Sequence, residues 1–211
     1  MSDSAVTPAR GGRLRRFLAD PLTSVIAALG VLPWLVQPGV IQPDTKIDLV
    51  AAPARYLARS LDAWSGHSGF GELQNQAYGY LFPMGAFFAL ADAVSLPGWA
   101  AQRAWWTLML IVGASGAALF ARRVLGVGTA AAALAGVLYA LSPRVLSLLA
   151  QLSVETWPGM VMPWLLLAVH ARRRPGGLSW RRYVGVVGML SAALGGVNAT
   201  ASLVAVLGAF V

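Results

Sequence analysis

The chain has 211 residues, of which 57% are hydrophobic and only 11% are charged, and its formal net charge is +8. Soluble chains carry about 25% charged residues, so this composition indicates a membrane protein and excludes an ordinary soluble enzyme. The positive charge does not indicate a nucleic-acid partner, because the arginines flank apolar blocks and form no basic amphipathic face. Cysteine is absent, which excludes disulfides and a thiol nucleophile.

Residues 1–20 form a basic tail, which we expect to lie in the cytoplasm. The apolar block near 22–41 has about the length of one transmembrane helix. No small-residue cleavage pattern closes it, so we predict an uncleaved first span. Further spans are predicted near 104–121, 129–145, 157–171 and 184–197. The third runs past Pro143, because its apolar block alone is short for about 30 Å of hydrocarbon. A break at 195–198 allows a sixth span from 199.

The segment 79–98 is apolar enough to resemble a span, but it contains two prolines and Asp92. If it does not cross, the large arginine clusters at 122–123 and 172–182 fall on the cytoplasmic side, as the positive-inside rule expects. If it crosses, both clusters fall outside. We therefore expect a surface helix within a long outer loop, 42–103. The predicted fold is an all-α polytopic membrane helical bundle with amphipathic surface helices in its first periplasmic loop. The chain stops inside an apolar block, so we expect it to be the start of a longer protein.

Asp44 and Asp48 follow the first predicted span. If a helix begins there, the two carboxylates share one face, with Lys46 on the other side of the turn. A carboxylate fixed where a span leaves the bilayer can act as a general base on a hydroxyl beside a lipid-borne substrate. The alternative is structural, because Asp44 follows Pro43 and can serve as the N-cap of a surface helix.

Amide and aromatic side chains gather in 71–85, where Gln74, Asn75, Gln76 and Tyr78 stand just before the surface segment. Amides offer both donors and acceptors to sugar hydroxyls, and aromatic rings offer an apolar platform to the sugar ring. Aromatic residues also collect at membrane interfaces without any catalytic reason. The amides are the stronger indication of a sugar site.

The second outer loop, 141–159, contains Arg144 and Glu155. The planar donors of Arg144 suit a lipid phosphate, and a snorkelling membrane anchor is the alternative. Glu155 is either a second site carboxylate or the acidic first turn of a helix that opens at Trp157. His67 has no second ligand at metal spacing, so no metal site is predicted. No cofactor is identifiable, and the sequence does not support a divalent cation.

Four stretches in combination, “DTKIDL”, “QNQAYGYLFPMG”, “ALSPRVLSLL” and “VETWPGMVMPWLLL”, resemble the actinobacterial and mycobacterial α-(1→3)-arabinofuranosyltransferases of the D type. These enzymes belong to the GT-C superfamily, and the resemblance covers Leu22 to the end. It implies an essential acid in the first outer loop, which matches Asp44 and Asp48. Lys46 or Arg144 would then offset charge on the leaving phosphate, while the amides of 74–76 hold sugar.

The same resemblance implies decaprenyl-phosphoryl arabinofuranose as the donor and an arabinan of arabinogalactan or lipoarabinomannan as the acceptor. Transfer would proceed with inversion, on the outer face of the plasma membrane, and the fragment alone is expected to be inactive. The rival interpretation is a multi-pass transporter or a non-catalytic lipid- or glycan-binding scaffold. Transporters place ionisable residues at mid-membrane depth, whereas the predicted spans lack acids, which favours chemistry at the surface.

Overall fold

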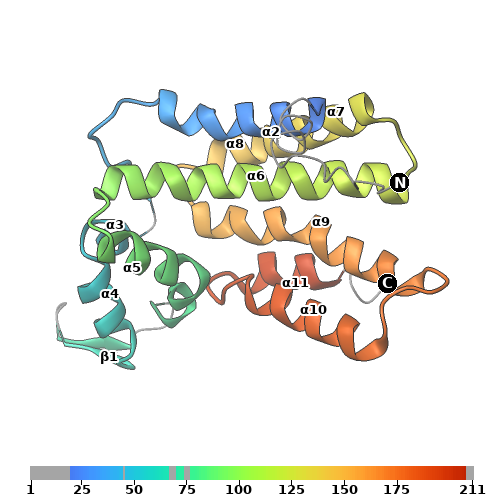
Figure 1. The fold of residues 1–211 in the computed structure, drawn as a ribbon. Helices are drawn as coiled ribbons and strands as arrows, with labels where there is room; N and C mark the ends of the chain where they lie inside the picture. Colours follow the sequence, from blue (N-terminus) through green and yellow to red (C-terminus); the bar gives the residue numbers. More distant parts are fainter. Residues whose placement is uncertain (1–19, 45, 67–69, 74–76, 208–211) are drawn as a thin grey trace, which may run out of the picture.

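The computed structural model describes residues 20–44, 46–66, 70–73 and 77–207 (Figure 1). The regular secondary structure of the described chain is helical except for one antiparallel ribbon, β1 (Trp64–Ser65) with β2 (Glu72–Leu73). Three short irregular helices are η1 (Leu32–Leu35), η2 (Ala77–Tyr80) and η3 (Leu81–Gly85). The α-helices are α2 (Pro21–Val31), α3 (Ile47–Ala51), α4 (Pro53–Ser60), α5 (Ala86–Ala93), α6 (Gly98–Val124), α7 (Thr129–Ala140), α8 (Pro143–Leu148), α9 (Ser153–Arg173), α10 (Trp180–Ala192) and α11 (Ala199–Leu207).

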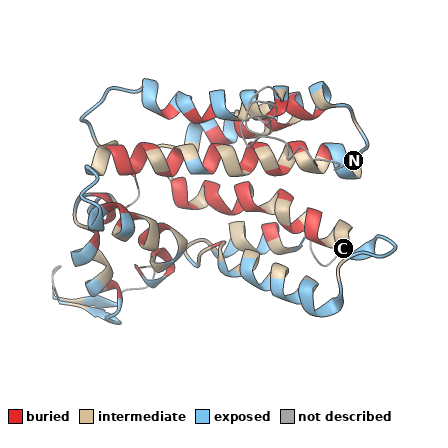
Figure 2. Cartoon of the chain, in the orientation of Figure 1, coloured by how far each residue is buried: buried red, intermediate tan, exposed pale blue. Residues whose placement is uncertain are grey.

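Helix α6 is the centre of the bundle. It packs against α2 and α7 on one side and against α9 on the other, and α10 and α11 pack beyond α9 (Figure 1). The short helices α3 to α5 and the ribbon lie together at one end of the bundle. Burial follows this arrangement, because α6 and α9 contain many buried residues whereas α10 contains none (Figure 2). This architecture confirms the predicted all-α membrane bundle.

Helix α9 tolerates an internal proline because a neighbouring helix replaces the lost hydrogen bond. Pro163 has no N–H to donate to the carbonyl of Gly159, four residues earlier. The hydroxyl of Tyr139, from α7, donates to that carbonyl oxygen at 2.5 Å. A hydroxyl from a packed helix therefore satisfies a carbonyl that lipid cannot hydrate.

Small residues allow α6 and α7 to approach closely. A Cβ added at Gly136 would lie 2.7 Å from the backbone oxygen of Ala114 and 3.2 Å from the Cβ of Ala118. The hydrophobic effect does not drive membrane helices together, because lipid tails are as apolar as their side chains. Close backbone packing of this kind stabilises their association instead.

We therefore expect Gly136→Ala to lower stability by about 1–3 kcal/mol, because a backbone oxygen cannot move aside as a flexible side chain would. Gly188→Ala, inside α10 with nothing within 4 Å of the added Cβ, is the matched control and should be neutral or stabilising by up to about 1 kcal/mol. Thermal unfolding of both full-length variants in detergent checks this. Equal midpoints would show that the α6–α7 contact adapts to a methyl group.

Several helix boundaries differ from the predicted spans, including those of α10, which covers Trp180–Ala192 where 184–197 was predicted. The first helical segment ends at Leu35 and not at 41, because Pro33, Pro38 and Gly39, with φ of +81°, interrupt the apolar block. Helix α6 begins at Gly98, six residues before the predicted start, and α9 begins at Ser153, four residues early. The segment 79–98 forms only short helices, of which the eight-residue α5 is the longest α-helix.

Length and composition single out two described helical stretches as long and apolar enough to cross a membrane, Gly98–Val124 and Thr129–Leu148. A shorter apolar stretch covers Pro21–Leu35. The second stretch continues past Pro143 as predicted, although it bends at 141–142 between α7 and α8. The break predicted at 195–198 is present between α10 and α11, where Gly195 has φ of +78°.

Candidate functional site

The carboxylate of Asp44 binds the start of α9. Its Oδ1 accepts a hydrogen bond from the backbone N–H of Ser153 at 3.2 Å, and its Oδ2 accepts one from the Ser153 hydroxyl at 2.5 Å. Asp44 is only 8% exposed. The first N–H groups of a helix lack partners within the helix and favour an anion. The first loop therefore supplies the cap of α9, whose own preceding residue, Leu152, makes no side-chain cap.

Two polar residues of α6, Gln102 and Arg103, hold the backbone of residues 40–42, which precede Asp44. The side-chain amide of Gln102 accepts from the N–H of Gln42 and donates to its carbonyl, both at 2.9 Å. Arg103 is fully buried, donates to the carbonyl of Val40 at 3.2 Å and stacks 4.5 Å from the ring of Trp106. Three backbone groups of the first loop are thus held by side chains before the chain reaches α9.

Asp44 and Asp48 do not share a helix face, so that prediction is wrong. Helix α3 begins at Ile47 with Lys46 at its N-cap position, and Asp44 lies outside it. The alternative that Asp44 is the N-cap of this local helix is also wrong, because Lys46 occupies that position and the carboxylate of Asp44 accepts from Ser153, 109 residues away.

Asp48 is exposed and stands in the first turn of α3. It lines a small cavity of about 70 Å³ with Arg55, Tyr56 and Arg59. Burial raises the pKa of Tyr56, the Ser60 side chain lowers it, and the charge of Asp48 raises it further. The two carboxylates therefore lie in different surroundings.

Arg144 and Glu155 line one cavity of about 430 Å³. The wall comes from the end of α7, from α8, from the first half of α9 and from α11, and it includes Tyr139 and Asn198. Glu155 follows Ser153 by two residues, so the cavity begins within one turn of the residue that binds Asp44. Glu155 lies in the first turn of α9, but that helix opens at Ser153 and not at Trp157 as predicted.

The remaining predicted residues contribute less to this arrangement. Lys46 is half-buried before α3, and Tyr78 is exposed in η2. Gln74, Asn75 and Gln76 lie outside the described residues. Within the part of the chain that the structure describes, no group of three or more histidines or acids is placed to hold a metal ion.

Sequence reasoning missed four residues that shape the site. Ser153 carried a weak signal, because serine is common at helix starts. Gln102 and Arg103 carried a stronger one, since adjacent polar residues beside an apolar block mark buried function or structure. Asn198 was not singled out from the sequence; its side chain caps α11 by accepting from the N–H of Ala201 at 2.9 Å.

Comparisons with known proteins agree with this fold. Residues 28–211 match the family model described as “Alpha-(1->3)-arabinofuranosyltransferase, N-terminal GT-C domain”. The chain is 46% identical over 188 residues to the alpha-(1->3)-arabinofuranosyltransferase of Mycolicibacterium smegmatis, covering 89% of this chain and 13% of that protein. It is 44% identical over 182 residues to the enzyme of the same name from Mycobacterium tuberculosis, covering 85% of this chain and 13% of that protein.

A solved structure gives the same relation. The chain is similar to the cryo-EM structure of the arabinofuranosyltransferase AftD from Mycobacteria, with a TM-score of 0.84 and 42% identity over 93% of this chain and 15% of that one. The chain therefore spans a small part of the relatives that it matches. It belongs to the alpha-(1->3)-arabinofuranosyltransferase family, and its residues 28–211 belong to the N-terminal GT-C domain of that family.

Proposed function

We propose that the full-length protein transfers arabinofuranose from decaprenyl-phosphoryl arabinofuranose to a cell-wall arabinan, and that this chain supplies part of the active site. One observation carries the proposal. The bond from Ser153 to Asp44 joins the first loop to the start of α9, two residues before Glu155, which lines a cavity together with Arg144. A carboxylate can act as a general base on a hydroxyl, and a guanidinium group can bind the phosphate of a lipid-linked sugar.

In the proposed reaction Asp44 accepts the proton of the acceptor hydroxyl. The hydroxyl oxygen attacks the anomeric carbon, the bond to the phosphate oxygen breaks, and polyprenyl phosphate leaves with inversion. Arg144 binds the phosphate through its planar donors. Glu155 accepts hydrogen bonds from sugar hydroxyls and orients them.

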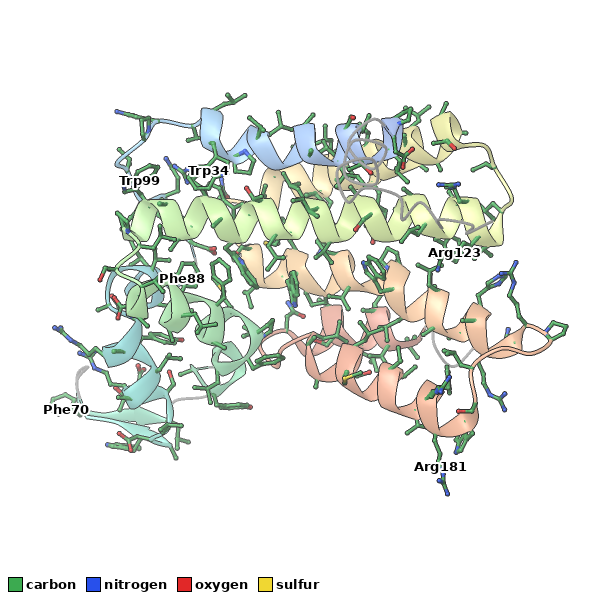
Figure 3. The ribbon with its side chains drawn as sticks, in the orientation of Figure 1. Trp34, Phe70, Phe88, Trp99, Arg123 and Arg181 are labelled. Carbon is green, nitrogen blue, oxygen red and sulfur yellow. The ribbon has the colours of Figure 1, made fainter. Side chains whose placement is uncertain are left out.

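The proposed placement has the N-terminus in the cytoplasm and the site facing outward from the plasma membrane. Arg123 and Arg181 lie at the end of the bundle opposite to Trp34 and Trp99 (Figure 3). Basic residues favour the cytoplasmic side and tryptophans favour membrane interfaces. The arginines support a cytoplasmic placement of their end, and we propose that the end with Trp34 and Trp99, where the first loop meets α6, is the outer end.

Arg144→Gln should raise the KM for the donor by roughly 10- to 100-fold, the value of one lost hydrogen-bonded charge on phosphate. Arg55→Gln is the matched control, because Arg55 is an exposed arginine of the first loop outside the cavity. Initial rates of arabinofuranosyl transfer, measured in membranes that contain equal amounts of each full-length variant, give both KM values. An unchanged donor KM for Arg144→Gln would place the phosphate elsewhere.

A further inference from the structure

A second cavity, of about 470 Å³, lies at the other end of the bundle. Four basic side chains line it: Arg123 from the last turn of α6, His170 from α9, Arg174 after α9, and Arg182 from the first turn of α10. Figure 3 shows Arg123 and Arg181, the neighbour of Arg182, at this end. Three separate elements therefore direct positive charge into one space.

The described chain supplies no counter-charge for this cavity. No Asp or Glu of the described residues is among its lining residues, and none of its three arginines has a salt bridge within the described part of the chain. The Nε2 atom of His170 is buried there and has no hydrogen-bond partner among the described residues. Like charges that converge without a counter-ion repel one another, so an anion in this space would stabilise the arrangement.

Part of the cavity wall is the turn between α9 and α10, which hydrogen bonds hold in place. The N–H of Leu178 donates to the carbonyl of Ala171 at 3.1 Å, and Arg172 donates to the carbonyl of Leu178 at 3.2 Å. The side chain of Ser179 accepts from the N–H of Arg182 and caps α10. The turn thus holds Arg174 and the start of α10 on either side of the space, and the helix start adds its own preference for an anion.

We propose that this cavity binds the phosphate group of an anionic phospholipid in the cytoplasmic leaflet. Guanidinium groups match phosphate oxygens in pairs of hydrogen bonds, and basic pockets at the cytoplasmic ends of membrane helices suit lipid headgroups. The same wall contains apolar Leu167, Pro175 and Leu178. Helix α10, which starts at the cavity, exposes Val184 and Met189 along its length. A phosphate with attached acyl chains fits these neighbours better than a soluble phosphate does.

The test compares two pairs of substitutions that remove the same charge from adjacent positions. All four arginines are exposed. Arg123→Gln with Arg182→Gln removes two that line the cavity, whereas Arg122→Gln with Arg181→Gln removes neighbours that do not line it. Purified full-length protein in a non-ionic detergent is titrated with phosphatidylglycerol or phosphatidylcholine, and bound lipid is counted by native mass spectrometry. We expect phosphatidylglycerol binding to weaken at least about tenfold in the first pair and less than about twofold in the second.

A charge-conserving variant and a measurement of unfolding serve as controls. Arg182→Lys keeps the charge but loses the planar fork, so it should weaken binding by an intermediate factor, and unchanged thermal unfolding of every variant shows that the fold is kept. Equal losses in the two pairs, or equal binding of phosphatidylcholine, would overturn the proposal. Displacement of the lipid by inorganic phosphate at a similar concentration would keep the anion site but overturn the lipid as its source.

Discussion

Replacing Asp44 with asparagine should lower arabinofuranosyl transfer by roughly 100- to 10,000-fold, the usual contribution of a positioned general base. Asparagine has nearly the same size, and its carbonyl oxygen still accepts a hydrogen bond from Ser153, so the cap on α9 is largely kept. It cannot accept the proton of the attacking hydroxyl. The measurement is transfer from decaprenyl-phosphoryl arabinofuranose to an arabinan oligosaccharide, in membranes containing the full-length variant at matched expression.

Asp48→Asn is the control for this experiment, because Asp48 is exposed and lies in a different cavity from Arg144 and Glu155. Its transfer rate should stay within about twofold of the parent. If the Asp44 variant keeps full activity, Asp44 is only a tertiary helix cap, and Glu155→Gln becomes the next variant to assay. If the Asp48 variant loses activity instead, the reacting hydroxyl binds at the surface of α3.

Gln102→Leu should make the backbone of the first loop around Gln42 more mobile. The leucine can neither accept from the N–H of Gln42 nor donate to its carbonyl, and each unsatisfied buried group costs about 1–3 kcal/mol. The loss of both bonds should make the Gln42 amide exchange at least roughly tenfold faster with solvent deuterium. Hydrogen exchange of the peptide that contains 40–44 measures this directly. Transfer activity should also fall, because the residues that precede Asp44 no longer hold it in position.

Gln102→Glu separates the two bonds. Its carboxylate still accepts from the N–H of Gln42 and has a counter-charge in Arg103, which already donates to the Gln102 side chain at 3.3 Å. It offers no donor to the Gln42 carbonyl. Exchange of the Gln42 amide should therefore change less in this variant than in the leucine variant. Unaltered exchange in both variants would mean that the bonds of Arg103 and Asp44 hold the loop without Gln102.

The helices were predictable because long apolar blocks have few alternatives in a membrane protein. Their ends were not, and α6 shows why. Gln102 and Arg103 look like residues that end a span, so the predicted helix began at 104. The structure buries both inside α6, where both form hydrogen bonds with the backbone of 40–42. A polar residue marks a helix end only if no other segment reaches it.

Individual residues of the candidate site could be predicted from the sequence, but their contacts with one another could not. Arg144 and Glu155 were each predicted as site residues from their chemistry, with a structural role as the alternative for each. The structure places both in the lining of one cavity. The partner of Asp44 could not be predicted, because Ser153 lies 109 residues further on and no local pattern connects them. Local reasoning assigned Asp44 to the nearest helix, whereas the unsatisfied start of a distant helix binds it.

That separation also sets an order of events during synthesis. The 109 residues between Asp44 and Ser153 take roughly 5–20 s to translate at about 5–20 residues per second. The first loop is therefore made, and its preceding helix inserted, well before the start of α9 exists. The proposed base therefore reaches its working position only after α6, α7 and α8 have been synthesised.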